Sequence, residues 1–560
     1  MAPDNYFIAD QFSLLSRLMD IHGENSFKSK AYSAAAFTIE KLPQQLSGID
    51  INKLSSIKGI GDSAAKKIVE VLQTGRLKAL DDLVQKTPPG IMEMLSIKGL
   101  GPKKIATIWK EMEIESIGEL LYACNENRLT LYKGFGEKTQ KNVQEAIEFY
   151  LSNIGSYLFA QIESYAEAIT QKLKSSFEDF LFLISGHFRR HIETIDTLEW
   201  VTTAPLPAVK DFMLKNNFVI DRESENFIAY KGEENILLAF NHSSNENIYT
   251  RLFETSCSEN FLAEWNKTFP AWHEKKYASE DEIFAAAGTD VIPAYMREKE
   301  DIIHQSLQNK IPQVIQAADI TAIIHSHSKW SDGVNTIEEM AKEAIRRGLQ
   351  FLVISDHSKS AFYANGLTEE RIKAQHAEID ELNKKLAPFK IFKSIESDIL
   401  NDGSLDYDDA TLASFDLVIA SVHSNLKMNE EKAMMRLMNA ISNPYTNILG
   451  HMTGRLLLSR NGYPVNHKTI IDLCAEKNVV IELNAHPRRL DIDWRWIDYC
   501  IEKSVLISID PDAHALEGFD DTKYGVLAAQ KAGLEKAMNL SSFSLNQFEQ
   551  WLSSQHRKRH

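Results

Sequence analysis

Seven short apolar segments recur between Ile320 and the end of this 560-residue chain, and each is followed by a polar loop. Most of these loops lead into an amphipathic stretch with helical spacing, of which residues 336–347 and 370–386 are the clearest. Strands and helices that alternate in this way form parallel sheets, and seven such units predict a (β/α)7 barrel. The predicted strands are residues 320–324, 351–354, 391–395, 417–421, 448–449, 479–483 and 505–509.

The positions that follow these predicted strands are rich in His, Asp and Glu. Chemistry on such barrels gathers at the carboxyl ends of the strands, so side chains placed there should share one rim. Alternate residues of a strand point to one face, so a His-x-His pair can reach a single ion. Asp510 and Asp512 compete for one position, and Asp512 is chosen because it repeats this spacing with His514. The nine predicted ligands are His325, His327, Asp332, His357, Glu396, His423, His451, Asp512 and His514.

Imidazoles combined with bridging carboxylates are typical of hydrolases that bind two or three divalent metal ions. Ions about 3.5–4 Å apart lower the pKa of a shared water towards neutrality and neutralise charge on a phosphoryl group. A metal-bound hydroxide would attack phosphorus, so no Ser or Cys nucleophile is needed. A single His is more often a hydrogen-bonded structural residue, but so many ligands at successive strand ends favour a metal-dependent phosphoesterase.

A second repeated pattern lies in the first 150 residues. An apolar-Lys-Gly-apolar-Gly unit followed by a helical stretch occurs at residues 57–61, 97–101 and 132–136. Paired glycines allow a tight turn close to a ligand, and free N–H groups at the next helix N-terminus suit a phosphate oxygen. A plain turn between packed helices is the alternative for any one copy, but three copies predict helix-hairpin-helix motifs that hold a nucleic-acid backbone. The predicted contact residues are Gly59, Gly61, Gly99, Gly101, Lys103, Gly134, Gly136 and Lys138.

Charge and cysteine content narrow the alternatives. The net charge of −16 disfavours a nucleic-acid partner for the chain as a whole. Residues 1–150 contain 19 basic and 19 acidic side chains, however, so the negative excess lies outside the repeats. The four cysteines lack the Cys-x-x-Cys spacing of a zinc site. No membrane span or export signal is visible, which predicts a cytoplasmic protein with no membrane partner. The predicted nucleic-acid-binding repeats would make it nucleoid-associated.

The sequence HSHSKWSDG at 325–333, with SDH at 355–357 and DAH at 512–514, resembles the PHP (polymerase and histidinol phosphatase) domain. Three helix-hairpin-helix units, a mixed middle region and this domain together resemble the bacterial and archaeal family X DNA polymerases over essentially the whole chain. The resemblance implies a 3′-5′ exonuclease in DNA repair that uses Mn²⁺. His-rich ligation by itself suits Zn²⁺ or Fe²⁺ equally well.

The resemblance also implies a multidomain α/β chain with a helical N-terminal region, an α+β middle and a C-terminal barrel. The expected divisions are a helical domain with a helix-hairpin-helix at 1–85, a finger-like helix-hairpin-helix domain at 86–153, a degenerate palm at 154–228, a degenerate thumb-like region and linker at 229–316, and the PHP domain at 317–560. In the middle region, residues 180–184 and 198–203 are predicted as strands, and 208–216 and 260–267 as helices.

The middle region departs from the family where the polymerase metals would bind. The family's Gly-Ser-x-Arg-Arg strand is recognisable at residues 186–190, but the Asp-x-Asp that follows is replaced by Thr-Leu-Glu at 197–199. The family also has a third Asp on a later strand, and the matching position in this chain is Leu237 or a neighbour, with no acid. The family's glycine-containing turn, which binds the nucleotide, is replaced by Glu-Thr-Ser-Cys at 254–257. Asp196, three residues from Glu199, would point to the opposite face of a strand. One Glu cannot supply the oxygen ligands of two Mg²⁺ ions, so the polymerase site is expected to be inactive.

Three basic residues have candidate roles. Lys67 matches the family's lyase lysine, which forms a Schiff base with the open sugar of an abasic site. A solvated or phosphate-contacting Lys is the simpler interpretation of that residue. Arg455 and Lys329 are candidates to clamp the scissile phosphate.

The leading hypothesis is a monomeric, DNA-binding, metal-dependent 3′-5′ exonuclease that acts on gapped, nicked or 3′-ended DNA and cleaves at abasic sites. One alternative is an active template-directed polymerase that proofreads with its PHP domain. Another is a non-catalytic DNA-binding scaffold for repair, which the ligand set disfavours because acids and imidazoles gathered without a metal are unfavourable. A small-molecule phosphatase would leave the three hairpins without a purpose.

Overall fold

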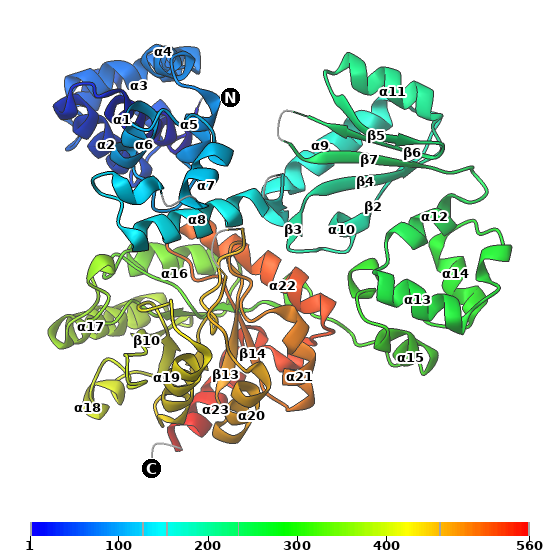
Figure 1. The fold of residues 1–560 in the computed structure, drawn as a ribbon. Coiled ribbons are helices and arrows are strands. Elements are labelled where there is room, and N and C mark those ends of the chain that lie inside the picture. The colour runs from blue at the N-terminus through cyan, green and yellow to red at the C-terminus, as the bar shows by residue number, and fades with distance from the viewer. Residues whose placement is uncertain (1–2, 126–127, 153–154, 233–234, 459–460, 558–560) are drawn as a thin grey trace. The chain divides into compact units, whose positions relative to one another are not determined.

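The computed structural model describes residues 3–125, 128–152, 155–232, 235–458 and 461–557. The chain divides into two compact units, Met1–Ile154 and Gly155–His560. The first is helical, and the second combines a five-stranded sheet with a seven-stranded parallel barrel, so the multidomain α/β prediction is confirmed (Figure 1). Within the described ranges, no helix has the length and hydrophobicity needed to cross a membrane.

The helices of the first unit enclose a single apolar core. They are α1 (Asn5–His22), α2 (Ser26–Glu40), α3 (Asp62–Thr74), α4 (Lys78–Gln85), α5 (Pro89–Met94), α6 (Pro102–Lys110), α7 (Ile117–Asn125) and α8 (Glu137–Ser152). The helices predicted after the three glycine repeats are α3, α6 and α8.

The three glycine repeats fold into the same turn. In each one the first glycine has a positive φ, between 88° and 96°, a conformation that is strained for other residues. The next residue, Ile60, Leu100 or Phe135, is buried and donates its N–H to the carbonyl oxygen three residues earlier, at 2.9–3.1 Å. The second glycine then directly precedes the helix, and Gly61 and Gly101 are the N-caps of α3 and α6.

The second unit begins with a five-stranded sheet of order β2-β4-β7-β6-β5. Its strands are β2 (Phe182–Ser185), β4 (Thr197–Thr202), β5 (Val219–Ser224), β6 (Phe227–Lys231) and β7 (Leu237–His242). β4 and β7 run parallel, and the other neighbours are antiparallel. A separate pair joins β1 (Tyr157–Leu158) to β3 (Thr194–Ile195), and the helices are α9 (Phe159–Ser176), α10 (Gly186–Arg189) and α11 (Leu206–Lys215). The sheet continues to His242, so the division expected between residues 228 and 229 falls inside β6.

A helical cluster follows the sheet. It contains α12 (Ile248–Thr255), α13 (Glu259–Thr268), α14 (Glu280–Ala287) and α15 (Asp301–Leu307). Buried Phe253, Trp265 and Phe284 pack against one another with ring centroids 5.0–5.6 Å apart. The helices between residues 248 and 307 therefore pack around an aromatic core and not against a sheet.

The C-terminal part is a nearly closed barrel of seven parallel strands in sequential order. The strands are β8 (Ala322–Ile323), β9 (Phe351–Ile354), β10 (Lys390–Asp398), β11 (Leu417–Ser421), β12 (Ile448–Leu449), β13 (Val480–Asn484) and β14 (Ile507–Asp510). Beyond the first and last strands, the bridge between Ser326 and Ala513 brings the two edges together, with His327 N donating to Ala513 O at 2.8 Å. Every predicted barrel strand is present.

Helices surround the barrel, as Figure 1 shows. They are α16 (Ile337–Arg346), α17 (Glu369–Leu386), α18 (Asp409–Leu412), α19 (Glu430–Ser442), α20 (His467–Lys477), α21 (Ile497–Glu502), α22 (Thr522–Lys531) and α23 (Leu545–His556). Thr336 and Glu339 form a capping box that fixes the start of α16. On α23, Phe548 stacks on Phe351 at 4.4 Å and contacts Phe392, both near the amino ends of their strands. The opposite, carboxyl ends carry the candidate site.

Candidate metal centre at the carboxyl ends of the barrel strands

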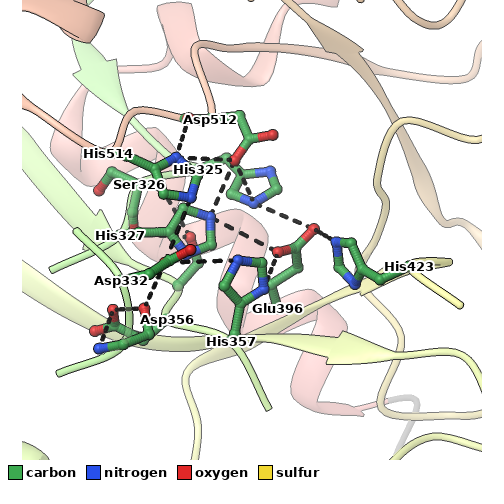
Figure 2. Close-up of polar contacts among 12 residues, drawn as sticks. His325, Ser326, His327, Asp332, Asp356, His357, Glu396, His423, Asp512 and His514 are labelled. Atoms are coloured by element: carbon green, nitrogen blue, oxygen red, sulfur yellow. Dashed lines mark hydrogen bonds and ion pairs between the residues drawn. The ribbon is translucent and has the colours of Figure 1, made fainter. Parts of the chain in front are cut away.

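The nine predicted ligands meet at one end of the barrel, although they come from six strands and their loops. Figure 2 labels all of them except His451. The first strand is shorter than predicted, because β8 ends at Ile323. His325 and His327 therefore lie on the loop after β8 and not on the strand itself. Their rings still share one centre, with centroids 5.1 Å apart. His357, His423, His451 and the pair Asp512 and His514 also follow their strands, whereas Glu396 lies within β10.

Glu396 is the carboxylate that the largest number of imidazoles face. Its Oε1 lies 2.9 Å from His451 Nε2 and 3.1 Å from His423 Nε2. Its Oε2 lies 2.9 Å from His357 Nδ1. Glu396, on the third barrel strand, thus lies between three imidazole rings, where its two carboxylate oxygens can bridge ions.

Asp512 and Asp332 supply the other two acids of the centre. Asp512 Oδ1 lies 3.0 Å from His327 Nε2 and 3.5 Å from His325 Nε2. Asp332 Oδ1 lies 3.4 Å from His514 Nε2. The backbone of Asp512 has a φ of 53°, a conformation that non-glycine residues adopt seldom and mostly at special sites.

All of these side chains except His451 fall into three overlapping groups, and within each group one ligand atom per residue lies within 4.8 Å of the others. The groups are His327, Asp332, His357 and His514; His325, His327 and Asp512; and His357, Glu396 and His423. Because His327 and His357 each belong to two groups, the groups form a continuous cluster. Its nitrogen and carboxylate donors fit several divalent cations.

Two buried carboxylates that the sequence reasoning missed orient the imidazoles. Glu482 Oε1 lies 2.5 Å from His325 Nδ1, and Asp398 Oδ1 lies 2.5 Å from His423 Nδ1. A carboxylate on Nδ1 keeps the proton there and leaves Nε2 as a lone pair for a cation. A third residue, Asn484, donates its Nδ2 to Asp512 Oδ2 at 3.1 Å. Glu482 and Asn484 share the inward face of β13, the one strand from which no ligand was predicted.

Several ring nitrogens among the ligand candidates have no hydrogen-bond partner. They include His325 Nε2, His327 Nδ1 and His451 Nδ1, and all three residues are buried. A buried polar atom without a partner is unfavourable and needs an explanation. For His325 Nε2, which faces the carboxylates of Glu396 and Asp512 at 3.5 Å, a cation bound among the same groups is that explanation.

The acids of the cluster are ionised. Burial alone would raise the pKa of Glu396, but the facing rings of His423 and His325 outweigh it and hold that pKa well below its ordinary value. Burial also opposes the low pKa of Asp512, which His325 and His327 hold well below the ordinary value. Burial lowers the pKa of His327 to about 3, so this ring is neutral. Burial alone would lower the pKa of His423 and His514, but the facing carboxylates of Glu396 and Asp332 outweigh it and raise these values to about 10 and about 9. A bound cation would displace the protons of these two rings.

Two further buried aspartates lie beside the cluster with structural contacts. Asp356 accepts hydrogen bonds from Ser328 N, Ser331 Oγ and Gln375 Nε2, and so holds the loop that carries Asp332. Asp510 accepts from Ser508 Oγ and Ser541 Oγ, and burial together with nearby Glu482 raises its pKa to about 7. Asp510 belongs to none of the three groups, and Asp512 does.

The two predicted phosphate clamps, Arg455 and Lys329, have different surroundings. The Arg455 guanidinium donates to Arg489 O and Leu490 O and pairs with Asp493, so it holds the loop after β13. Lys329 is exposed. Arg489, which was not predicted, extends from the loop that Arg455 holds, and its Nε lies 3.5 Å from Asp512 Oδ2. The guanidinium of Arg489 therefore lies beside a ligand candidate.

The predicted DNA-contacting residues lie on the three turns of the first unit. Gly61, Gly101 and Gly136 are exposed, and a Cβ added to any of them would meet nothing within 4 Å. Lys103 and Lys138, on the first turns of α6 and α8, are exposed as well. Backbone N–H groups of these helix starts are therefore open to a phosphate.

The candidate lyase residue Lys67 lies on α3. Its Nζ is 5.7 Å from the centroid of the Tyr32 ring. The Tyr32 hydroxyl lies 2.9 Å from Ser63 Oγ, one turn before Lys67 on the same helix.

The five-stranded sheet has a single candidate acid where a polymerase would need several. Glu199 on β4 is paired with Ser185 on β2 and with Ala239 on β7, so neither neighbour is acidic. Leu237, where the third acid was sought, is paired with Thr197. Burial raises the pKa of Glu199, and nearby Asp196 adds to that rise. Among the described residues, none of the three-residue groups able to hold a metal includes Glu199.

Known protein families match the three parts of the chain that carry these features. The helix-hairpin-helix domain matches residues 3–77 and the SAM-like helix-hairpin-helix tandem matches 91–148. The PHP domain matches 324–486. Asp512 and His514 lie beyond the matched part of the PHP domain.

Individual proteins are similar over different lengths. DNA polymerase/3'-5' exonuclease PolX of Bacillus subtilis (strain 168) is 33% identical over 558 residues, which cover 95% of this chain and 96% of that protein. A probable phosphatase of Caldanaerobacter subterraneus subsp. tengcongensis is 29% identical over 171 residues, or 29% of this chain and 60% of the phosphatase. A probable phosphatase of Clostridium acetobutylicum is 26% identical over 201 residues, covering 34% of this chain and 78% of that protein.

Proposed function

Starting from the fact that this chain belongs to the PolX family, we propose that its barrel hydrolyses DNA from the 3′ end in a reaction that depends on divalent metal ions. The observation that carries the proposal is the convergence of six histidines on the carboxylates of Glu396, Asp512 and Asp332. The Bacillus subtilis relative is named as a 3′-5′ exonuclease, and the similarity runs along nearly the whole of both chains.

We propose that the cluster holds two or three ions, and its three groups, which overlap through shared histidines, support this number. We propose Mn²⁺ as the working metal, with Zn²⁺ and Fe²⁺ as the alternatives that the same donors accept. Bound ions would polarise the phosphoryl group and acidify a water molecule. The three groups would hold the ions, and Glu482 and Asp398 would keep the coordinating nitrogens of His325 and His423 free of protons. One copy of the chain contains all nine ligands, so we take the monomer to be the active form.

The substrate in this proposal is gapped, nicked or 3′-ended DNA in repair, including abasic sites. Three exposed helix-hairpin-helix turns support it, because such turns bind the phosphate backbone without regard to sequence. Lys67 is a further proposal within this function: as a lyase nucleophile it would act on the open sugar of an abasic site. Lys67→Ala should then remove sodium borohydride trapping of the protein on abasic DNA and leave 3′ shortening unchanged.

The alternative function is template-directed polymerisation, which the name of the Bacillus subtilis relative favours. We propose that this chain does not polymerise, because Glu199 has Ser185 and Ala239 as its sheet neighbours. Two-metal nucleotidyl transfer needs several oxygen ligands on hard cations, and one carboxylate does not provide them.

One assay distinguishes the exonuclease from the polymerase and from a non-catalytic DNA-binding scaffold. Purified protein is incubated with a 3′-recessed labelled duplex, all four dNTPs and either Mg²⁺ or Mn²⁺. We expect shortening with Mn²⁺, and a loss of at least about 100-fold in the double variant His325→Ala, His327→Ala, because losing a ligand should exceed the effect of losing its orienting partner. The matched control His273→Ala, His304→Ala removes two exposed histidines outside the barrel and should retain activity. Extension of the primer would establish the polymerase instead, and binding without any turnover would establish the scaffold.

A further inference from the structure

The loop that follows β13, residues 485–496, contacts two distant places in the second unit. Near its start, Arg489 Nε lies 3.5 Å from the ligand candidate Asp512, measured to Oδ2. At its end, Arg495 Nη1 lies 3.1 Å from Glu193 Oε1, which belongs to the segment between α10 and β3 of the middle region. Glu193 is buried, although 302 residues separate it from Arg495. One loop of the barrel therefore contacts both the metal cluster and the middle region.

Two further ion pairs connect the ends of this loop. Arg495 Nη1 lies 3.0 Å from Asp493 Oδ1, and Asp493 Oδ2 accepts from Arg455 Nη1 at 2.5 Å. Arg455 Nε in turn donates to Arg489 O at 2.9 Å. Burial alone would raise the pKa of Asp493, but Arg455 and Arg495 outweigh it and lower that pKa. A continuous series of charge-assisted contacts thus runs from Glu193 to the backbone of Arg489, and such contacts are stronger than neutral hydrogen bonds.

The buried ring of Trp494 joins the end of the loop to the middle region a second time. The cationic groups of Lys531, Arg495 and Lys299 lie 4.7, 4.6 and 5.9 Å from the centroid of this ring. Lys299 also donates to Arg495 O at 3.3 Å, and Lys531 donates to Arg190 O at 2.7 Å. Cation–π contacts are stronger where water is excluded. The end of the loop is therefore fixed on the middle region.

The backbone beside Arg489 needs support from outside the loop. Leu490 has a φ of 42°, a conformation that is unfavourable for a residue with a side chain and persists only where the surroundings hold it. The Arg455 guanidinium supplies such support, because it donates to both Arg489 O and Leu490 O. Asp493 and Arg495 hold Arg455 in turn, so the support begins at Glu193.

We propose that Glu193 of the middle region is a positioning residue for the barrel reaction. It holds Arg495 and, through Asp493 and Arg455, keeps Arg489 beside the metal cluster. The inference rests on the proposed exonuclease function and gives the middle region a part in it. The region whose sheet has a single candidate acid would then support hydrolysis at the barrel.

Hydrogen exchange of metal-free, full-length protein tests the contact without relying on activity. In Glu193→Ala, peptides from residues 485–496 should exchange about tenfold faster than in wild type, because the loss of one charge-assisted hydrogen bond has about this effect on local opening. Glu163→Ala is the matched control. Glu163 on α9 also joins the middle region to the barrel, at 2.6 Å from Lys523 Nζ on α22, and its removal should leave exchange of the loop unchanged.

Kinetics on 3′-ended DNA with Mn²⁺ tests whether Glu193 acts through Arg489. Glu193→Ala should lower kcat/KM about tenfold in the otherwise wild-type protein. In an Arg489→Ala protein the same substitution should change kcat/KM by less than about twofold, because the side chain that it positions is already absent. Glu193→Gln keeps the shape of the side chain and a weaker hydrogen bond to Arg495, so its effects should be intermediate. This variant also serves if Glu193→Ala does not fold.

Three results would overturn the inference. Unchanged exchange of the loop in both Glu193 variants would show that Glu193 does not hold it. If exchange rises but kcat/KM is unchanged, or falls equally in the Arg489→Ala protein, Glu193 supports the fold and does not position Arg489, while the exonuclease function stands. If wild type shortens no DNA with Mn²⁺, the proposed function fails and the positioning role fails with it, even where exchange shows that Glu193 holds the loop.

Discussion

Glu482 shapes the centre without belonging to any of its three ligand groups. Its Oε1 faces His325 Nδ1, and its Oε2 accepts from His451 N at 2.6 Å. One buried acid thus fixes the ring of one ligand and the backbone of another. Orienting acids of this kind typically change metal affinity by 10- to 100-fold when they are removed.

We therefore expect Glu482→Gln to weaken Mn²⁺ binding by about 10- to 100-fold, because the neutral amide no longer holds the proton on His325 Nδ1. Calorimetric titration of metal-free protein measures this change. Glu476→Gln, at the exposed end of α20, is the matched control. An unchanged affinity in a folded Glu482→Gln protein would show that His325 does not need its acidic partner.

Arg489 is the expected phosphate contact of the barrel. Its Nε lies 3.5 Å from Asp512 Oδ2, so its guanidinium is beside the ligands, whereas Arg455 is engaged by backbone carbonyls and Asp493. Arg489→Ala should lower kcat/KM for DNA by about 10- to 100-fold, the range for a hydrogen bond to a charged group. Arg489→Lys should fall between, because Lys lacks the guanidinium fork. Steady-state kinetics would refute this contact if Arg489→Ala matched the outer-surface control Arg346→Ala.

At the level of single residues, the sequence was informative where a polar side chain follows an apolar strand. His357 and His423 were identified in this way, and both lie in the cluster. Glu482 was missed because it lies inside an apolar strand, where a single acidic residue does not by itself indicate a functional site. Its alternate spacing with Asn484 was the available signal. Arg455 was misplaced because closeness in sequence to His451 does not show which way a side chain points.

The glycine turns offer a prediction at the scale of the element. Gly59 and Gly99 both have a positive φ, but a Cβ at Gly59 would lie 2.3 Å from Thr38 Oγ1, whereas one at Gly99 would meet nothing within 4 Å. Gly99→Ala should destabilise its turn by about 1–2 kcal/mol through backbone strain alone. Gly59→Ala should destabilise more, and adding Thr38→Ala should remove the excess.

Hydrogen exchange of peptides that span the two turns, measured in the full-length protein, gives the local free energy of opening for each variant. Equal effects of Gly59→Ala and Gly99→Ala would contradict the steric part of this account. No effect of either would contradict the strained turn itself.

Elements were predicted better than their pairing. The apolar runs of β9, β11 and β12 were placed to the residue, because a buried parallel strand is apolar on both faces. The length of β8 was overestimated, since its apolar run continues after the strand pairing ends. The parallel pairing of β4 with β7 could not be predicted from the sequence, because alternation of polar and apolar residues shows a face and not a neighbour.

At the scale of the whole molecule, a buried ion pair joins the sheet region to the helical cluster. Glu280 on α14 lies 2.6 Å from Arg189 Nη2 and 2.7 Å from Arg297 Nη1. Burial alone would raise the pKa of Glu280, but Arg297 and Arg189 outweigh it and lower that pKa to about 2. A carboxyl group with a lowered pKa stabilises the fold above its ordinary pKa, and this contribution disappears as the pH falls.

This ion pair should therefore lose about 3 kcal/mol of stabilisation between about pH 5 and pH 2. Glu280→Gln should destabilise the region by about 3–5 kcal/mol at pH 7, because buried Arg297 would lose its partner, and should flatten the acid dependence. Hydrogen exchange of peptides from residues 248–307 at several pH values measures both effects. If the stability of this region fell with pH as steeply in Glu280→Gln as in the exposed control Glu259→Gln, its loss at low pH would come from groups other than Glu280.

Contacts between distant parts of the chain were beyond sequence reasoning. Lys531 Nζ donates to Arg190 O at 2.7 Å across 341 residues, and burial lowers the pKa of this lysine to about 8. A lysine in an amphipathic helix gives no sign of such a partner. Of the five expected divisions of the chain, the one at residue 153, where glycine repeats give way to mixed strands and helices, lies beside the boundary between the two compact units.

The central claim is that the carboxyl ends of the barrel strands bind a cluster of divalent cations. Crystals of the full-length protein soaked in Mn²⁺ and measured at the manganese absorption edge test it most directly. The account predicts two or three anomalous peaks among the His, Asp and Glu side chains around Glu396 and Asp512, and their loss in His325→Ala, His327→Ala. Peaks elsewhere, or none at this cluster in protein that shortens DNA, would contradict it.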